Sequence, residues 1–173
     1  MSARGTYEET DGRPAVRFVR ELRHPRDAVW RMVTDPEELA HWFPCEVQLG
    51  EARAGAPMRF VFSPDFAIDG QVLECDPPAR FSFRWGEDVL AFTLDERAGG
   101  TRLTMVHVLN EEGAPAASKT AAGWHLCLDA LGERLDGRTP DVARDGRPTP
   151  EWRARYEEYQ AAGVPSGAEV PEA

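Results

Sequence analysis

Basic residues are scarce relative to acidic ones in this sequence, and the shortage excludes whole classes of partner. The 173 residues contain 20 Lys and Arg against 30 Asp and Glu, which gives a formal net charge of −10. A net anion repels phosphate backbones and anionic lipid headgroups, so neither nucleic acid nor a membrane surface is an expected partner. No stretch approaches the ~20 apolar residues that a bilayer-spanning helix needs.

Cysteine is also rare, and its spacing argues against cross-links. Cys45, Cys75 and Cys127 are odd in number and far apart, which suits neither a disulfide framework nor a zinc site. Residues 1–14 are polar and lack the apolar core of a signal peptide. We therefore expect a cytoplasmic protein with reduced thiols.

Motifs that would indicate an active site are missing as well. The sequence contains no His-Glu-x-x-His, paired Cys-x-x-Cys, glycine-rich phosphate loop or serine elbow. His125 and Cys127 lie two residues apart on a predicted helix, where side chains at i and i+2 point to different sides. They therefore cannot act directly as a nucleophile and its base. We expect no metal and no cofactor.

Strand-like alternation is what the sequence has in abundance, above all between residues 46 and 110. Turns rich in Pro, Gly and Asp separate the predicted strands, and neighbours joined by such short connections pair antiparallel. In the last three strands the apolar residues share one face, so one face is covered and the other is wet. The predicted strands are Val16–Leu22, Glu46–Gly50, Pro57–Ser63, Ile68–Cys75, Arg80–Trp85, Asp88–Arg97 and Thr101–Asn110.

Helical signals lie on both sides of that region. Two short helices are predicted between residues 25 and 43, the second with Asp35 as its N-cap and Pro36 at its first position. Ala116 to about Leu135 is predicted to form a helix of ~20 residues, ~30 Å long, with an apolar face. The pattern predicts an α+β fold in which a curved antiparallel sheet of six to seven strands wraps around the long helix and encloses an apolar cavity.

The two ends of the chain are predicted to lie outside this core. Residues 1–13 are expected to form a loose arm, and residues 138–173 a polar extension with a solvated tail after Gly163. Within the extension, a short helix is predicted near residues 150–162. Its Trp152, Tyr156 and Tyr159 recur at helical spacing, so this stripe needs a surface to dock on.

Four segments, in order, resemble one known group of proteins. They are residues 24–42 (HPRDAVWRMVTDPEELAHW), residues 70–78 (GQVLECDPP) with the aromatic strand that ends at Trp85, residues 100–107 (GTRLTMVH), and Gly123-Trp124 followed by Leu128 and Leu131. The sequence resembles the SRPBCC (START/birch-allergen-like) superfamily, nearest the branch named after activators of the heat-shock-protein-90 ATPase. Each segment alone is weak, but four in the right order are specific for the fold.

The resemblance implies a helix-grip fold with a hydrophobic cavity between sheet and long helix, over about residues 14–137. It does not imply one activity, because relatives bind lipids, hormones or polyketides, some cyclise polyketides, and some serve stress responses. Function on such a scaffold depends on the pocket.

Large side chains on the covered faces are the main candidates for lining a pocket of ~300–1,000 Å³. Any single one of them is more often an ordinary core residue. The candidate ligand-binding residues are Trp42, Phe60, Phe62, Phe83, Trp85, Phe92, Met105, His107, Trp124 and Leu128. The sides on which Arg20, Arg59 and Glu74 lie are left open by the alternation.

His107 is the polar residue of most interest, because alternation places it beside Leu103 and Met105. It is either a core histidine bonded to a neighbouring loop, which is the more common case, or a donor that orients a ligand. An unpaired buried imidazole would cost about 1–3 kcal/mol, so a partner is required.

Three hypotheses follow for the function. The first is a container for an apolar small molecule, which needs only the cavity. The second is an enzyme of the polyketide cyclase or dehydratase type, with His107 as a weak catalytic candidate. The third is a chaperone accessory that binds a protein through the outer sheet face or the Trp152 stripe. The tail helix and an edge strand would also offer surface for a homodimer, and the sequence leaves the oligomeric state open.

Overall fold

A single antiparallel sheet and a long helix dominate the part of the chain that the computed structural model describes, residues 3–144 and 147–172. Within these residues, eight strands pair in the order β1-β2-β8-β7-β6-β5-β4-β3. The strands are β1 (Thr6–Thr10), β2 (Arg13–Leu22), β3 (Glu46–Leu49), β4 (Pro57–Ser63), β5 (Phe66–Asp76), β6 (Arg80–Trp85), β7 (Asp88–Arg97) and β8 (Gly100–Val108). The helices are α1 (Arg26–Thr34), α2 (Pro36–Leu39), α3 (Ala117–Leu135) and α4 (Pro150–Ala161), and one 3₁₀ turn, η1 (Ala114–Ala116), precedes α3.

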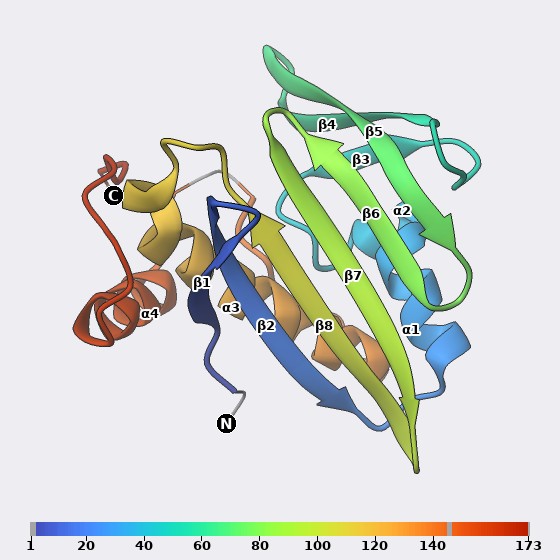
Figure 1. The fold of residues 1–173 in the computed structure, drawn as a ribbon. Coiled ribbons are helices and arrows are strands. Elements are labelled where there is room, and N and C mark those ends of the chain that lie inside the picture. The colour runs from blue at the N-terminus through green and yellow to red at the C-terminus, as the bar shows by residue number, and fades with distance from the viewer. Residues whose placement is uncertain (1–2, 145–146, 173) are drawn as a thin grey trace.

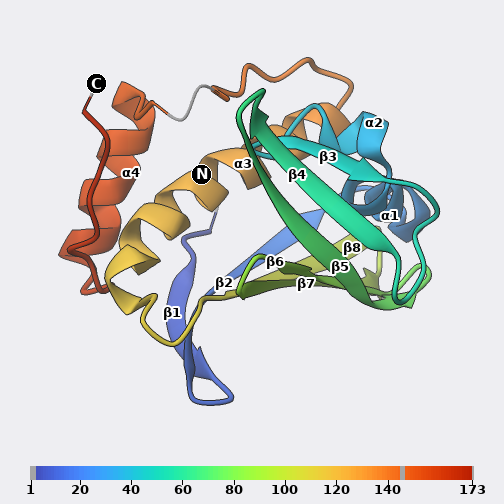
Figure 2. The same cartoon turned by 90° about the horizontal axis from the view of Figure 1, so that it is seen from above.

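The sheet curls around α3, as Figures 1 and 2 show from two sides. Seen from above, β3, β4 and β5 rise along one flank of the helix, while β2, β8 and β7 pass beneath it. The apolar face of α3, including Ala121, Trp124, Leu128 and Leu131, is buried against the concave side. This arrangement confirms the predicted α+β helix-grip fold.

The two short helices begin as predicted. Asp35 caps α2 by accepting a hydrogen bond from the Glu37 backbone N–H at 2.9 Å, and Pro36 occupies the first position of the helix. A missing N–H has no consequence there, because the first turn has no intrahelical acceptor for it. Leu39 and the following Trp42 are thereby turned into the core.

The N-terminal arm is not loose, and the predicted strand count was therefore too low. Residues Thr6–Thr10 form β1 and pair with Arg13–Arg17 of β2 across a tight turn. Asp11 and Gly12 both have positive φ in that turn, 51° and 77°. Asp-Gly with two positive φ angles is the sequence typical of a two-residue hairpin. The prediction missed it because the polar composition of β1 hides its alternation.

The C-terminal segment packs onto the body of the protein. Tyr159 of α4 is fully buried, and Val164 is buried beyond it. Ser118 at the start of α3 donates from its hydroxyl to the Val164 carbonyl at 2.9 Å and from its backbone N–H to the Pro165 carbonyl at 2.9 Å. The Ala168 N–H donates to the Pro115 carbonyl at 3.0 Å. The prediction of a solvated tail after Gly163 is wrong over these residues, because backbone bonds to the η1–α3 junction order them.

Candidate ligand-binding site

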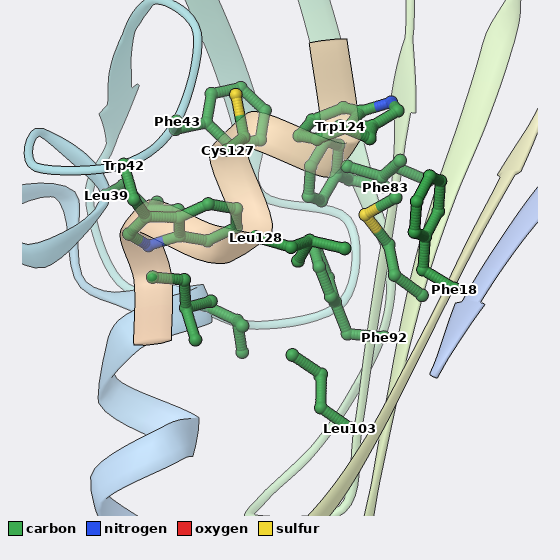
Figure 3. Packing of buried hydrophobic residues seen from close by; sticks show 14 of the residues in the cluster. Phe18, Leu39, Trp42, Phe43, Phe83, Phe92, Leu103, Trp124, Cys127 and Leu128 are labelled. Atoms are coloured by element: carbon green, nitrogen blue, oxygen red, sulfur yellow. The ribbon is translucent and has the colours of Figure 1, made fainter. Parts of the chain in front are cut away.

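All ten candidate residues lie between the sheet and α3. β4 carries Phe60 and Phe62, β6 Phe83 and Trp85, β7 Phe92, β8 Met105 and His107, and α3 Trp124 and Leu128, while Trp42 follows α2. Eight are buried, and Phe62 and Trp85 are half-buried. Figure 3 shows Trp42, Phe83, Phe92 and Trp124 directed into the space between helix and sheet.

Phe43 joins these rings into one cluster, and the sequence-based candidates omitted it. Its ring centroid lies 5.4 Å from that of Trp124, 5.5 Å from Trp85 and 6.1 Å from Phe60. Most of its ring contacts are tilted or edge-on, the geometry that aromatic pairs favour. Phe43 directly follows the buried Trp42, and helical spacing predicts that both residues are buried. That spacing does not indicate that Phe43 contacts the aromatic residues of the sheet. The rings fill the grip by packing against one another.

The two clearest hollows among the described residues lie outside this cluster. One, of about 570 Å³, is open to solvent between α2, β3 and β4, and includes Pro36, Leu49 and Asp69. The other, of about 540 Å³, lies between α1 and the β5–β6 turn, beside Trp30 and Pro78. Neither contains any of the ten candidate residues. Because the rings contact one another across the space between the sheet and α3, we expect a ligand bound there to displace rings.

The aromatic cluster reaches the surface at one end of the sheet. The rings of Phe62 and Trp85 are parallel to within 3° with centroids 6.1 Å apart, and Phe66 lies 5.4 Å beyond Phe62. Phe66 covers the stacked rings of Phe62 and Trp85, but its own side chain is 56% exposed and is therefore not held in place by burial. We call Phe62, Phe66 and Trp85 the aromatic rim. The ligand-binding candidates from the sequence did not include Phe66, because the prediction placed it in the loop before the strand Ile68–Cys75, whereas β5 begins at Phe66.

Local backbone features place the rim. The register between β4 and β5 shifts at Phe62, between the pairs Val61–Ala67 and Ser63–Phe66. A bulge of this kind bends the strand and changes the direction of a side chain. Gly70 pairs with Trp85 on the neighbouring strand. A Cβ at Gly70 would collide with the Arg84 carbonyl and would lie 2.7 Å from the Phe60 ring. Glycine at this position therefore allows the Phe60 ring to lie against the β5 backbone.

His107 has both ring nitrogens engaged by protein groups. Trp124 donates from its indole N–H to Nδ1 of His107 at 2.8 Å. Because Nδ1 accepts, the neutral ring carries its hydrogen on Nε2, which donates to Oδ2 of Asp88 at 2.8 Å. The imidazole also stacks on Trp85 with centroids 5.7 Å apart. His107 therefore connects α3 to β7 and leaves no ring nitrogen for a ligand.

Asp88 is the partner that the sequence analysis did not identify. Its Oδ1 accepts the backbone N–H of Asn110 at 2.8 Å while Oδ2 accepts from His107. Burial alone would raise the pKa of Asp88, but the hydrogen bonds from His107 and Asn110 outweigh it and lower that pKa below its usual value.

The Asp88 bonds predict an acid-sensitive contribution to stability. Since the folded-state pKa lies below the unfolded value of about 3.9, the contribution is fully present above about pH 4 and is lost as the pH falls through the folded-state pKa. Asp88→Asn offers one acceptor oxygen for two donors, so we expect a loss of about 1–2 kcal/mol at pH 7 and a flatter pH profile between pH 4 and pH 2. Urea unfolding across this range measures both.

Asp95 on the same strand is the matched control for that experiment. It is exposed, and its ion pair to Arg97 is long at 3.9 Å. Asp95→Asn should leave both the stability and the pH profile close to wild type, because exposed pairs contribute little. Equal behaviour of the two variants would refute the assigned role of Asp88.

Trp85 differs from the other tryptophans of the cluster in its indole N–H. Trp42 donates to the Met32 carbonyl at 2.8 Å, and Trp124 donates to His107. Within the described residues, Nε1 of Trp85 is buried and has no hydrogen-bond partner. A buried donor without an acceptor is rare and destabilising, so it needs an explanation.

A second buried polar cluster lies at the β1–β2 edge of the sheet. Tyr159 of α4 accepts the Gly5 N–H at 2.9 Å and bonds to Nδ1 of His125 at 2.8 Å. Arg20 points inward from β2, donates to the Ala3 carbonyl at 2.6 Å and lies 3.7 Å from Asp129. Burial lowers the pKa of both Arg20 and His125. This cluster joins the N-terminal segment, α3 and α4. Of the three charged residues whose sides the alternation left open, Arg20 is therefore buried, whereas Arg59 and Glu74 are exposed.

The buried cysteines are chemically quiet. Burial raises the pKa of Cys45 and of Cys127 to about 12, so neither forms the reactive thiolate near neutral pH. Among residues 3–144 and 147–172, no three His, Cys, Asp or Glu side chains are placed to hold a metal ion. No helix in the same residues is long and apolar enough to cross a membrane.

A curved antiparallel sheet closed over a long helix, with an aromatic interior, defines the helix-grip class of proteins. Residues 23–136 match the family described as Activator of Hsp90 ATPase homolog 1-like protein, and the chain belongs to that family. This confirms the resemblance found in the sequence. No curated protein matches the chain.

Solved structures with the same fold cover most of the chain. EF2215 from Enterococcus faecalis, a conserved protein of unknown function, has a TM-score of 0.72 at 24% identity, covering 91% of each chain. CalU16 from Micromonospora echinospora has a TM-score of 0.70 at 23% identity, covering 94% of this chain and 95% of its own. DynU16, from the dynemicin biosynthetic locus, has a TM-score of 0.64 at 28% identity, covering 72% of this chain and 48% of DynU16.

Proposed function

We propose that this protein is a cytoplasmic container that binds an apolar small molecule between the sheet and α3. The observation that carries the proposal is the continuous ring cluster, which runs from buried Phe43 and Phe83 to half-buried Phe62 and Trp85 and exposed Phe66. Apolar rings that extend from the core to the solvent provide a binding surface for an apolar ligand and a path by which it enters the interior. The three free cysteines fit a reducing compartment.

The route to the interior passes through the aromatic rim. Phe66 is held mainly by its contact with Phe62, and turning it away costs little because it is already 56% exposed. Phe62 comes next, unpaired in its bulge, and behind it lies Trp85 against Phe60 and Trp124. An apolar ligand that replaces these contacts keeps the rings out of water, so the filled grip and the binding function are compatible.

Binding is favoured over catalysis by the state of His107. A cyclase or dehydratase of the kind considered from the sequence would need a ring nitrogen within reach of bound substrate. Both nitrogens of His107 are bonded, to Trp124 and Asp88. CalU16 and DynU16 share the fold. DynU16 is a protein of the dynemicin biosynthetic locus, which is consistent with a small-molecule ligand here.

Two large hydrophobic residues that are exposed, Phe66 and Leu73, provide a matched test of the route. Phe66 belongs to the rim, whereas Leu73, 44% exposed, is the bulged residue of β5. We expect N-phenyl-1-naphthylamine to bind the wild-type protein with increased fluorescence. Phe66→Asp should weaken its affinity about 5- to 10-fold, because a carboxylate at the mouth must be desolvated, and Leu73→Asp should leave the affinity unchanged.

Equal weakening by both substitutions would mean that the probe binds by general surface hydrophobicity. Absence of probe binding to wild-type protein, at concentrations where it is soluble, would count directly against the container. Both variants lie at exposed positions, so their folding is expected to match wild type within about 0.5 kcal/mol.

A further inference from the structure

Trp85 carries a buried N–H without a partner at the inner edge of the proposed binding site. Nε1 of an indole is a donor only, so whatever satisfies it must present an acceptor atom. The indoles of Trp42 and Trp124 in the same cluster both have acceptors supplied by the protein. The missing partner is therefore specific to the tryptophan of the rim.

The surroundings of Trp85 restrict the shape of that partner. Phe62 lies parallel to the indole, His107 stacks on it at 29°, and Trp124 meets it edge-on. Flat aromatic faces accept a flat aromatic molecule in the same offset or edge-on contacts that they make with one another. The displaced ring of Phe62 or Phe66 would be replaced by a ring of the ligand.

The charges near Trp85 restrict the chemistry of the acceptor. Asp88 pairs with Trp85 across the hairpin, and its carboxylate is committed to His107 and Asn110. An anionic ligand would be repelled by this carboxylate and by a chain with a net charge of −10. A ligand hydroxyl would bring a hydrogen-bond donor of its own into surroundings made of aromatic rings, where that donor would lack an acceptor. A neutral carbonyl oxygen accepts without either penalty.

We infer that the ligand of this site is a planar aromatic ketone or a related carbonyl compound, whose oxygen accepts a hydrogen bond from Nε1 of Trp85. The inference rests on the proposed function, since it names the class of molecule that the container holds. It assigns Trp85 as the residue that distinguishes an aromatic carbonyl compound from an aromatic hydrocarbon.

A pair of ligands with matched shapes tests the assignment. 2-Acetonaphthone carries a carbonyl oxygen where 2-isopropenylnaphthalene carries a methylene group of similar size. The ratio of their dissociation constants in wild type is compared with the ratio in Trp85→Phe, so that differences in ligand solvation cancel. The preference of wild type for the ketone should fall about 10-fold in Trp85→Phe. Trp152→Phe, at a half-buried position of α4 outside the ring cluster, should keep the wild-type ratio.

A second readout uses wild-type protein alone and does not depend on the folding of a variant. In ¹H–¹⁵N spectra, the indole N–H of Trp85 should move downfield when the ketone binds and not when the hydrocarbon binds. The Trp42 indole, already bonded to Met32, serves as an internal reference.

The possible failures are distinct. If neither ligand binds wild type, the proposed function itself fails. If both ligands bind but the Trp85 signal is indifferent to the carbonyl and the ratio survives in Trp85→Phe, the container stands and the inference about its ligand is overturned.

Discussion

Replacing Trp42 by alanine is expected to lower the free energy of unfolding by about 4 kcal/mol and the melting temperature by roughly 10 °C. The side chain is fully buried and packs edge-on against Phe43 at 5.6 Å and Phe92 at 6.2 Å. Its indole also donates to the Met32 carbonyl at 2.8 Å, joining the end of α1 to the segment after α2. The alanine variant loses the ring contacts and leaves that carbonyl without its donor.

Chemical unfolding monitored by circular dichroism measures this loss. Trp152→Ala is the control, because Trp152 is half-buried on α4, outside the ring cluster, and stacks on Tyr156 with ring centroids 5.1 Å apart. It should cost about 1 kcal/mol or less. Trp42→Phe separates ring from hydrogen bond and should fall between the two. A Trp42→Ala variant within 1 kcal/mol of wild type would mean that the grip is not packed as described.

Tyr159→Ala is expected to cost about 3–5 kcal/mol, although its helix lies outside the segment matched by the family. Tyr159 is fully buried between α3 and β2, with its ring 6.4 Å from Phe18. Its hydroxyl is the acceptor for Gly5 and a hydrogen-bond partner of His125. Removal of the side chain leaves a cavity and breaks both of these hydrogen bonds at once.

Hydrogen exchange locates the damage. We expect the amides of α4 and of Gly5 to lose protection in Tyr159→Ala, while those of β6 and β7 retain it. Tyr159→Phe keeps the ring and should cost only about 1–2 kcal/mol. Tyr156→Ala on the same helix, half-buried, is the positional control. Retained protection of α4 in Tyr159→Ala would show that the backbone bonds of residues 164–168 suffice to hold the tail.

Strand alternation and helix capping were enough to predict most of the fold. Phe83, Phe92 and Met105 fall on the buried face because side chains in a strand alternate between two sides, and this holds wherever one side is covered. The start of α2 followed from Asp35 and Pro36 alone. β1 was missed because a two-stranded edge of polar residues carries little hydrophobic pattern, even with Asp-Gly at its turn.

The details of the candidate site could not be predicted in the same way. Alternation puts Trp85 and His107 on the concave face, but whether rings line a cavity or fill it depends on rotamers and on how tightly the sheet curls. The contact of Phe43 with the sheet aromatics is long-range, and the bulge at Phe62 has no local signature in the sequence. The Asp88–His107–Trp124 chain of hydrogen bonds likewise requires the register of three elements.

Intermolecular NOEs in a complex of the protein with 2-acetonaphthone test the central claim most directly. If an apolar molecule binds between the sheet and α3 behind the aromatic rim, the naphthalene protons should show NOEs to the side chains of Phe62, Trp85 and Trp124, and none to exposed Leu73. NOEs confined to Leu73 or to the surface hollow beside Pro36 and Leu49, or none at saturating ligand, would contradict the proposed container.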